Sequence, residues 1–301
     1  MTKLENDYER MVPEYHHGML MYGEHIMRYE SVADIVKDKI VLDIASGSGY
    51  GTATLAKTAN KVYGVDINEK AVNYSIENFG NKKTTFLVGS GTDIPLETDS
   101  VDIVVSHETI EHIDDYRKFM REIKRVLKNG GQAIISTPND DEYPAGNHFH
   151  LHQFKVKEFK KLLQSYFTNV DLYYQGAWIS AALLNEKEFT TEWRQSMETF
   201  KTQAQPTVKS TYVVAVCSDK KVSKLKSLAA YTEPWSDKEL RELAQARQDE
   251  IQNIKDGYGK HIEKLEEQLR LITSSRSWRV TRPLRALNAR RQKSTTKKSK
   301  K

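Results

Sequence analysis

Short apolar runs recur along the chain between residues 40 and 217, and amphipathic segments separate most of them. The apolar runs, which have the pattern of strands, are 39–45, 61–67, 84–90, 101–107, 131–137, 170–176 and 211–217. The segments with the pattern of helices are 51–58, 69–78, 115–128 and 155–166. Alternating apolar strands and helices predict an α/β fold with a parallel, doubly wound sheet of seven strands.

Two further segments belong to this predicted domain. Residues 14–37, ahead of the first strand, are expected to form one or two covering helices. Residues 177–208 form an insert between the last two strands, and its apolar side chains suit a lid or a substrate wall. These side chains are Trp178, Ile179, Leu183, Leu184, Phe189 and Trp193.

The pattern changes beyond Cys217. The sequence PWSDKEL (234–240) is typical of a helix start, with Ser236 as N-cap and Glu239 completing a capping box. Apolar residues then recur at spacings of three and four, which predicts either a coiled coil with one stutter or a single helix packed on the domain. These residues are Ile251, Ile254, Tyr258, Ile262, Leu265, Leu269 and Ile272.

The expected organisation is therefore a domain over 1–218, a linker over 219–235, a helix or coiled coil over 236–273 and a basic tail over 274–301. The coiled coil would make the protein a homo-oligomer.

Charge is distributed unevenly. The net charge is +5, yet residues 276–301 hold eleven Lys/Arg and no Asp/Glu, so the preceding 275 residues are acidic with a net charge of −6. Within the tail, Trp278, Val280, Leu284 and Leu287 lie among arginines. Such a segment can bind an anionic membrane surface, and nucleic acid is the competing partner.

No run approaches the roughly 18 apolar residues of a membrane span. The first residues are charged and lack the apolar core of a signal peptide, and the single Cys217 fits a reducing compartment. We expect a cytoplasmic protein, with the basic tail holding it peripherally at the inner face of the cell membrane.

A glycine-rich loop follows the first predicted strand in DIASGSGYG (43–51). Glycines at 47, 49 and 51 permit a tight turn and close approach of a ligand to the backbone. The same pattern fits a dinucleotide site or a purely structural turn. Asp66 ends the second strand, where a carboxylate can accept both ribose hydroxyls of a nucleoside.

Five segments in order resemble the motifs of class I S-adenosylmethionine-dependent methyltransferases. They are DIASGSGYG, VYGVDIN, GSGTDIPL, DSVDIVVS and REIKRVLKNGGQAIISTPN. The resemblance, which runs from about Glu24 to Cys217, implies a Rossmann-like fold and S-adenosylmethionine as cofactor. It implies that Asp43 and the 45–49 backbone, including Ala45, Gly47 and Gly49, face the methionine and ribose portion. Asp66 and Ile67 would lie at the ribose, and Ser90, Gly91 and Thr92 at the adenine.

The segments GEHIMRYE, SHETIEHI, ISTPN and NHFHLHQF resemble methyltransferases of bacterial surface-polysaccharide biosynthesis more closely, as does SSRSWRVTRPLR in the tail. This resemblance places Arg28 and Tyr29 near the cofactor, with Arg28 toward its carboxylate. It implies a glycan or glycolipid substrate and a glycosyltransferase partner.

The sequence SHETIEH (106–112) places acidic and imidazole side chains at the end of the fourth strand. On a helix, Glu108, Glu111 and His112 would share one face, where two carboxylates repel each other unless a cation lies between them. The E-x-x-E-H spacing resembles the metal-binding segment of small-RNA 2′-O-methyltransferases and of some quinone O-methyltransferases. With the downstream His150, it implies a Mg²⁺, Mn²⁺ or Zn²⁺ site that activates the acceptor.

An imidazole base is the alternative to a metal, and His107, His148 and His152 are its candidates. We therefore expect His107, Glu108, His112 and His150 to contribute to catalysis. The expected reaction is methyl transfer from S-adenosylmethionine to an oxygen, most simply a sugar hydroxyl of a surface polysaccharide. RNA 2′-O-methylation, small-molecule (quinone-type) O-methylation and a non-enzymatic scaffold of a polysaccharide assembly complex are the alternatives.

Overall fold

The computed structural model describes residues 4, 10–17, 19–143, 147–177 and 209–230 of the chain. It also describes a few positions further on: 245, 252, 262, 265, 267–271, 273 and 278. The chain divides into two units, Met1–Glu233 and Pro234–Lys301. Among the helices described, none combines the length and apolar character that crossing a bilayer requires.

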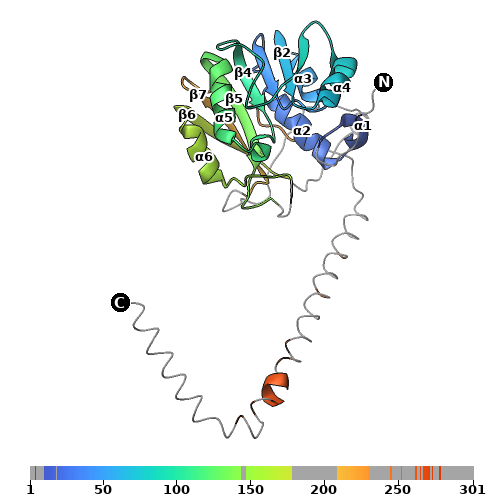
Figure 1. The fold of residues 1–301 in the computed structure, drawn as a ribbon, viewed down its shortest axis with the longest axis vertical. Helices are drawn as coiled ribbons and strands as arrows, with labels where there is room; N and C mark the ends of the chain where they lie inside the picture. The colour runs from blue at the N-terminus through green and yellow to red at the C-terminus, as the bar shows by residue number, and fades with distance from the viewer. Residues whose placement is uncertain are drawn as a thin grey trace, which may run out of the picture. The chain divides into compact units, whose positions relative to one another are not determined.

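A seven-stranded sheet forms the centre of the first unit, as predicted (Figure 1). Its strands are β1 Ile40–Ile44, β2 Lys61–Asp66, β3 Thr84–Val88, β4 Val101–Ser106, β5 Leu127–Pro138, β6 Asn169–Gln175 and β7 Tyr212–Ser218. Their spatial order is β3-β2-β1-β4-β5-β7-β6. Because β1 lies between β2 and β4, the chain order reverses there, and open α/β sheets bind ligands at such a point.

The prediction that all strands are parallel is wrong for β7. This strand lies between β5 and β6 and pairs antiparallel with both, with Ile135 opposite Ala215 and Leu172 opposite the same Ala215. The sequence could not show this, because a strand buried on both faces has the same apolar run in either direction. The sheet is therefore mixed.

Six α-helices and a 3₁₀ turn accompany the strands in the described part of the first unit, and α1 and α2 precede β1. They are α1 Pro13–His16, α2 Leu20–Ser31, α3 Tyr50–Leu55, α4 Glu69–Phe79, η1 Ile110–His112, α5 Tyr116–Val126 and α6 Val156–Gln164. Side chains cap the first turns of two helices: the Asn68 carboxamide accepts a hydrogen bond from the Ala71 N–H at α4, and the Asp115 carboxylate accepts one from the Lys118 N–H at α5.

Apolar side chains fill both faces of the sheet, as a doubly wound fold requires. Leu42 of β1 packs in the cluster that contains Phe119 of α5 and Phe159 of α6. Its neighbour Val41 packs in the opposite cluster with Tyr29 of α2 and residues of α3. Successive residues of a strand point to opposite faces, so the one strand anchors both layers.

The chain after β7 is bound to the first unit beyond the predicted boundary at residue 218. The Ser223 N–H donates to the Gln132 side chain, the Leu225 N–H to the Tyr173 hydroxyl, and the Lys226 N–H to the Ser31 carbonyl. Residues 219–226 are therefore not a free linker.

The predicted insert lies almost wholly outside the described residues, and so does most of the basic tail. Residues 267–271 are helical, and Ile262, Leu265 and Leu269 are exposed. Self-association through this helix stays a prediction.

Candidate functional site

The glycine loop joins β1 to α3 through three residues with positive φ: Ala45 at 60°, Gly47 at 56° and Gly49 at 83°. A Cβ added at Gly49 would lie 2.5 Å from the Ser75 hydroxyl and 3.1 Å from the Phe86 ring. The turn therefore needs glycine at 49 for both its backbone angle and its space. Within the loop, the Ser46 N–H donates to the Val65 carbonyl and the Gly49 N–H to the Ser46 carbonyl.

Asp66, at the end of β2, holds this loop in place. Its carboxylate accepts hydrogen bonds from the Gly47 N–H at 2.8 Å and the Asn68 N–H at 2.9 Å. Each carboxylate oxygen has a further lone pair, so Asp66 can accept ligand hydroxyls as well. The next residue, Ile67, is 74% exposed and lies at the rim.

Asp43, the second carboxyl group of this region, is fully buried beneath the loop. Its carboxylate accepts hydrogen bonds from the Thr52 hydroxyl at 2.7 Å and the Tyr29 hydroxyl at 3.2 Å. Burial raises the pKa of the Asp43 carboxyl to about 7, although both hydrogen bonds act in the other direction. Tyr29 thus supports the loop from α2.

The loop after β3 carries the residues expected at the adenine. The Ser90 hydroxyl lies 3.0 Å from the Thr92 hydroxyl and accepts a bond from the Thr92 N–H. A Cβ at Gly91 would lie 2.9 Å from the Phe119 ring. Ser90 is thus part of a local turn with Thr92.

Arg28 is a charged residue of α2 that is buried, with 3% of its surface exposed. Its Nη1 donates to the Gln175 side chain at 3.0 Å. Its Nε and Nη2 are buried and have no partner in the described part of the chain. Buried donors without partners are rare, so this side chain is suited to bind an anion.

His107 and Glu108 follow β4. The His107 imidazole packs edge-on against the Tyr29 ring, with centroids 5.0 Å apart, and both its buried nitrogens lack a described partner. Burial lowers the pKa of His107 well below its usual value, and the positive charge of Arg28 lowers it further. The imidazole is therefore neutral at pH 7.

Glu108 does not share a helix face with Glu111 and His112, which corrects the sequence-based expectation. It has φ +50° and precedes the short turn η1, which holds only residues 110–112. Its carboxylate accepts the Ser136 hydroxyl at 2.6 Å. A left-handed residue ends any helical repeat, so the i, i+3, i+4 argument fails at this position.

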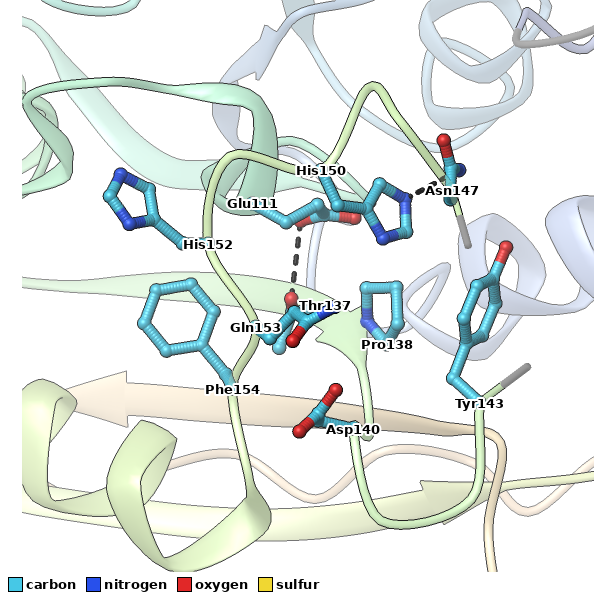
Figure 2. Close-up of a pocket in the computed structure, with 10 residues that line it drawn as sticks. All are labelled: Glu111, Thr137, Pro138, Asp140, Tyr143, Asn147, His150, His152, Gln153 and Phe154. Carbon is cyan, nitrogen blue, oxygen red and sulfur yellow. Dashed lines mark hydrogen bonds between the residues drawn. The ribbon is translucent and has the colours of Figure 1, made fainter. Parts of the chain in front are cut away.

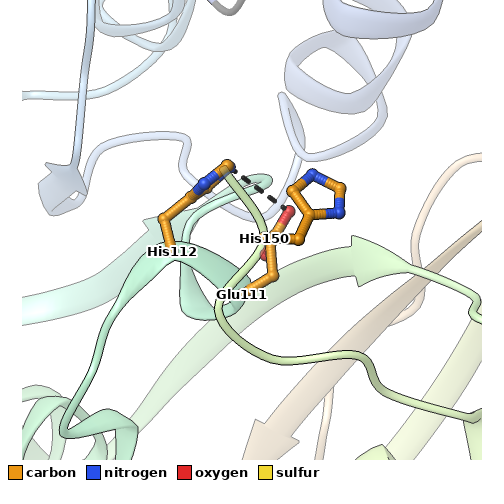
Figure 3. Close-up of side chains that lie close together, drawn as sticks. All are labelled: Glu111, His112 and His150. Carbon is orange, nitrogen blue, oxygen red and sulfur yellow. Dashed lines mark ion pairs between the residues drawn. The ribbon is translucent and has the colours of Figure 1, made fainter. Parts of the chain in front are cut away.

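Glu111, His112 and His150 do come together, as Figure 3 shows. Each offers one ligand atom, and these atoms all lie within 4.8 Å of one another. Glu111 is buried, and burial together with the negative charge of Glu108 raises the pKa of its carboxyl well above the usual range. One Glu111 oxygen accepts the Thr137 hydroxyl at 3.2 Å, while Oε1 lies 4.0 Å from His112 Nε2.

A cavity of about 20 Å³ adjoins this cluster, and Figure 2 shows its walls. Glu111, His150 and Tyr143 line it, and Asn147 bonds to the His150 ring at 2.9 Å. The volume suits roughly one water molecule or ion.

Of the other histidines considered as bases, His152 lines the same cavity as Glu111 and His150. His148 is exposed. The His152 Nε2 lies 3.0 Å from the Asp114 carbonyl oxygen, and its ring packs on Tyr116. Neither is oriented toward the strand ends by a described contact.

Sequence reasoning missed several residues that shape the site: Thr52, Ser136, Thr137, Gln175 and Tyr212. Thr52 lies one turn into α3 and could have been suspected from its closeness to the glycine loop. Gln175 and Tyr212 lie at the ends of distant strands, and nothing local in the sequence connects them with Arg28.

Comparison with known proteins agrees with this architecture. Residues 42–135 match the family model described as "Methyltransferase domain". A "Probable S-adenosylmethionine-dependent methyltransferase" of Mycolicibacterium smegmatis is 30% identical over 162 residues, which is 52% of this chain and 62% of that protein. One from Mycobacterium tuberculosis is 31% identical over 160 residues, covering 52% and 58%. The chain thus spans about three fifths of the length of these curated relatives.

Among solved structures, a chain of the complex between the Trm112 methyltransferase activator and a methyltransferase of Haloferax volcanii aligns with a TM-score of 0.50. The sequences are 18% identical, and the alignment covers 69% of this chain and 92% of that one. The alignment shows a shared fold, and residues 42–135 are similar to a methyltransferase domain.

Proposed function

We propose that this protein transfers a methyl group from S-adenosylmethionine to the oxygen of a sugar hydroxyl in a surface glycan. One observation supports the cofactor most directly. The glycine loop and Asp66 lie where β1 and β2 end, and the charge of Arg28, whose Nε and Nη2 are unpartnered, acts on His107 after β4. These groups offer a carboxylate for ribose and a cation for a carboxylate.

The residues present fit the cofactor. The Asp66 carboxylate has lone pairs left for ribose hydroxyls, and the Ser46 hydroxyl is buried in the glycine loop without a described partner. Arg28 supplies the charge that a methionine carboxylate needs. When bound, S-adenosylmethionine supplies an electrophilic methyl group on a positively charged sulfur.

His107 is the proposed base. An acceptor hydroxyl ionises only weakly at neutral pH, so a neutral imidazole that receives its proton assists the reaction. Both His107 nitrogens lack a described partner, and the Tyr29 ring holds the imidazole in place. His112, His150 and His152 each have a described neighbour at hydrogen-bonding distance, so His107 fits this role best.

A metal at Glu111, His112 and His150 is a second way to activate the acceptor. Two imidazoles and one carboxylate suit Mn²⁺ or Zn²⁺ better than Mg²⁺, which prefers oxygen ligands. The cavity beside them has room for an ion, and Glu111 Oε1 has no hydrogen-bond partner among the described residues. Glu108, bonded to Ser136, is not part of this ligand set.

Labelled S-adenosylmethionine, incubated with glycan, RNA and quinone-containing fractions of the source cell, tests the reaction and the acceptor together. We expect label in the glycan fraction. If the label appears only in RNA or only in a small molecule, that molecule is the acceptor and the proposed glycan acceptor is wrong. No label in any fraction, with no cofactor binding by calorimetry, would leave the scaffold alternative.

Two variants separate the base from the metal. If His107 is the base, His107→Gln loses turnover, while His150→Ala and exhaustive chelation have little effect. If the metal activates the acceptor, chelation and His150→Ala abolish turnover and Mn²⁺ restores activity after chelation. His148→Ala is the matched control, since this histidine is exposed and is not among the residues that line the cavity.

A further inference from the structure

The guanidinium of Arg28 is a buried charge, and it acts to lower the pKa values of the Glu24 and Glu108 carboxyls, which burial raises. No described carboxylate forms an ion pair with it, and only one of its three nitrogens has a hydrogen-bond partner. A buried charge is costly unless it is paired and hydrogen-bonded. Two residues, one from β6 and one from β7, contact the guanidinium without neutralising its charge.

Gln175, the last residue of β6, is the first of them. Its side-chain oxygen accepts the bond from Arg28 Nη1 at 3.0 Å, and its side-chain nitrogen donates to the Glu24 carbonyl at 3.0 Å. The second bond fixes which end of the carboxamide faces Arg28. Because an amide carries no charge, Gln175 orients the guanidinium without neutralising it.

Tyr212, the first residue of β7, is the second. The Arg28 guanidinium carbon lies 4.8 Å from the centre of the Tyr212 ring. A cation over an aromatic face is attracted to it, and this contact again adds no negative charge. Gln175 and Tyr212 are paired across the antiparallel β6–β7 ladder, so one strand pair sets both contacts.

We infer that Gln175 and Tyr212 are positioning residues that hold Arg28 ready for the carboxylate of the cofactor's amino-acid arm. This inference rests on the proposed function, since it presumes that the nucleoside binds at the glycine loop. It gives the β6–β7 strand pair a role in ligand choice. The site selects nucleoside thioethers with an amino-acid carboxylate over the same nucleoside without it.

The test uses two stable ligands and calorimetry on the full-length protein. S-adenosylhomocysteine has the amino-acid arm, and 5′-methylthioadenosine has the same adenosine and sulfur without it. Gln175→Glu places a carboxylate beside Arg28, and Tyr212→Leu removes the ring. We expect each to weaken S-adenosylhomocysteine binding roughly 10- to 100-fold, as for a lost charge-assisted bond, and to leave 5′-methylthioadenosine binding unchanged.

Tyr212→Phe is the matched control, because it keeps the ring under the guanidinium, and we expect its affinities to equal those of the wild type. Unchanged S-adenosylhomocysteine affinity in Gln175→Glu and Tyr212→Leu would overturn the inference. Equal weakening of both ligands would also overturn it, because it indicates general damage to the domain. If the wild-type protein binds neither ligand, the proposed function itself fails, a result distinct from the other two.

Discussion

Replacing Asp43 with asparagine removes a buried carboxyl while keeping its shape. The carboxylate lies under the glycine loop and receives the Thr52 and Tyr29 hydroxyls. Asparagine retains one acceptor oxygen, and each hydroxyl can also accept a bond from its N–H₂ group. The main change is therefore the loss of a titrating group from the interior.

The sign and size of the effect follow from the pKa of Asp43, which burial raises from 3.8 to about 7. Between these values the unfolded chain has lost the proton that the folded chain retains. Folding then takes up a proton, so stability falls as pH rises and levels off above pH 7. Each pKa unit corresponds to about 1.4 kcal/mol, so the wild-type protein loses about 3 kcal/mol of stability from pH 5 to pH 8 through this residue.

Urea unfolding of the wild type and Asp43→Asn at pH 5, 6, 7 and 8 measures this difference. The free energy of unfolding of Asp43→Asn, taken relative to that of the wild type, should rise by about 3 kcal/mol from pH 5 to pH 8. Most of this rise should occur below pH 7.

Asp102→Asn is the control. The Ile40 N–H and the Lys128 ammonium hold the pKa of Asp102 below its usual value, so its titration lies below pH 4 and its effect should be constant across the series. Parallel stability profiles for the wild type and Asp43→Asn would refute the reasoning.

Three other predictions follow from the loop and the C-terminal segment. Asp66→Ala should weaken S-adenosylhomocysteine binding by roughly 1.5–3 kcal/mol in calorimetry, because it removes both the ribose acceptor and the bond to Gly47; unchanged affinity would contradict the assignment. Gly49→Ala should lower the free energy of unfolding by about 1–3 kcal/mol, since φ is 83° and Ser75 occupies the space of a Cβ. Ending the chain at residue 235 should give a monomer that no longer sediments with anionic vesicles yet binds cofactor, and a full-length monomer that ignores vesicles would contradict this.

The sequence predicted the order of elements well because each was marked locally. The seven apolar runs match the seven strands within a few residues, and α4 and α5 begin just after Asn68 and Asp115, residues that cap helices well. The direction of β7 is a different kind of information. It depends on which strand the returning chain meets, and the residues of VVAVC are equally buried in either direction.

The candidate site also contains residues of two kinds: those that a local motif marks and those that only the completed fold brings together. The glycine loop and Asp66 are close in sequence and were found from their motifs. Glu108 was misplaced because helical spacing was assumed through a residue whose backbone is left-handed. Gln175 lies 147 positions from Arg28, so only the completed sheet brings the two side chains together.

Buried polar atoms without hydrogen-bond partners are concentrated at one edge of the sheet. In the described part of the chain, buried side-chain atoms without a hydrogen-bond partner occur in Arg28, Ser46, Ser106, His107, Glu111 and Ser210. Four of these six residues lie at the ends of β1 and β4 or just after them: Ser46, Ser106, His107 and Glu111. Burial and the charge of Arg28 both lower the pKa of His107. Each such atom costs free energy in the absence of a ligand. A ligand that forms hydrogen bonds to several of these atoms at once offsets that free-energy cost when it binds. The affinity of the edge where β1 and β4 end is therefore increased by these atoms.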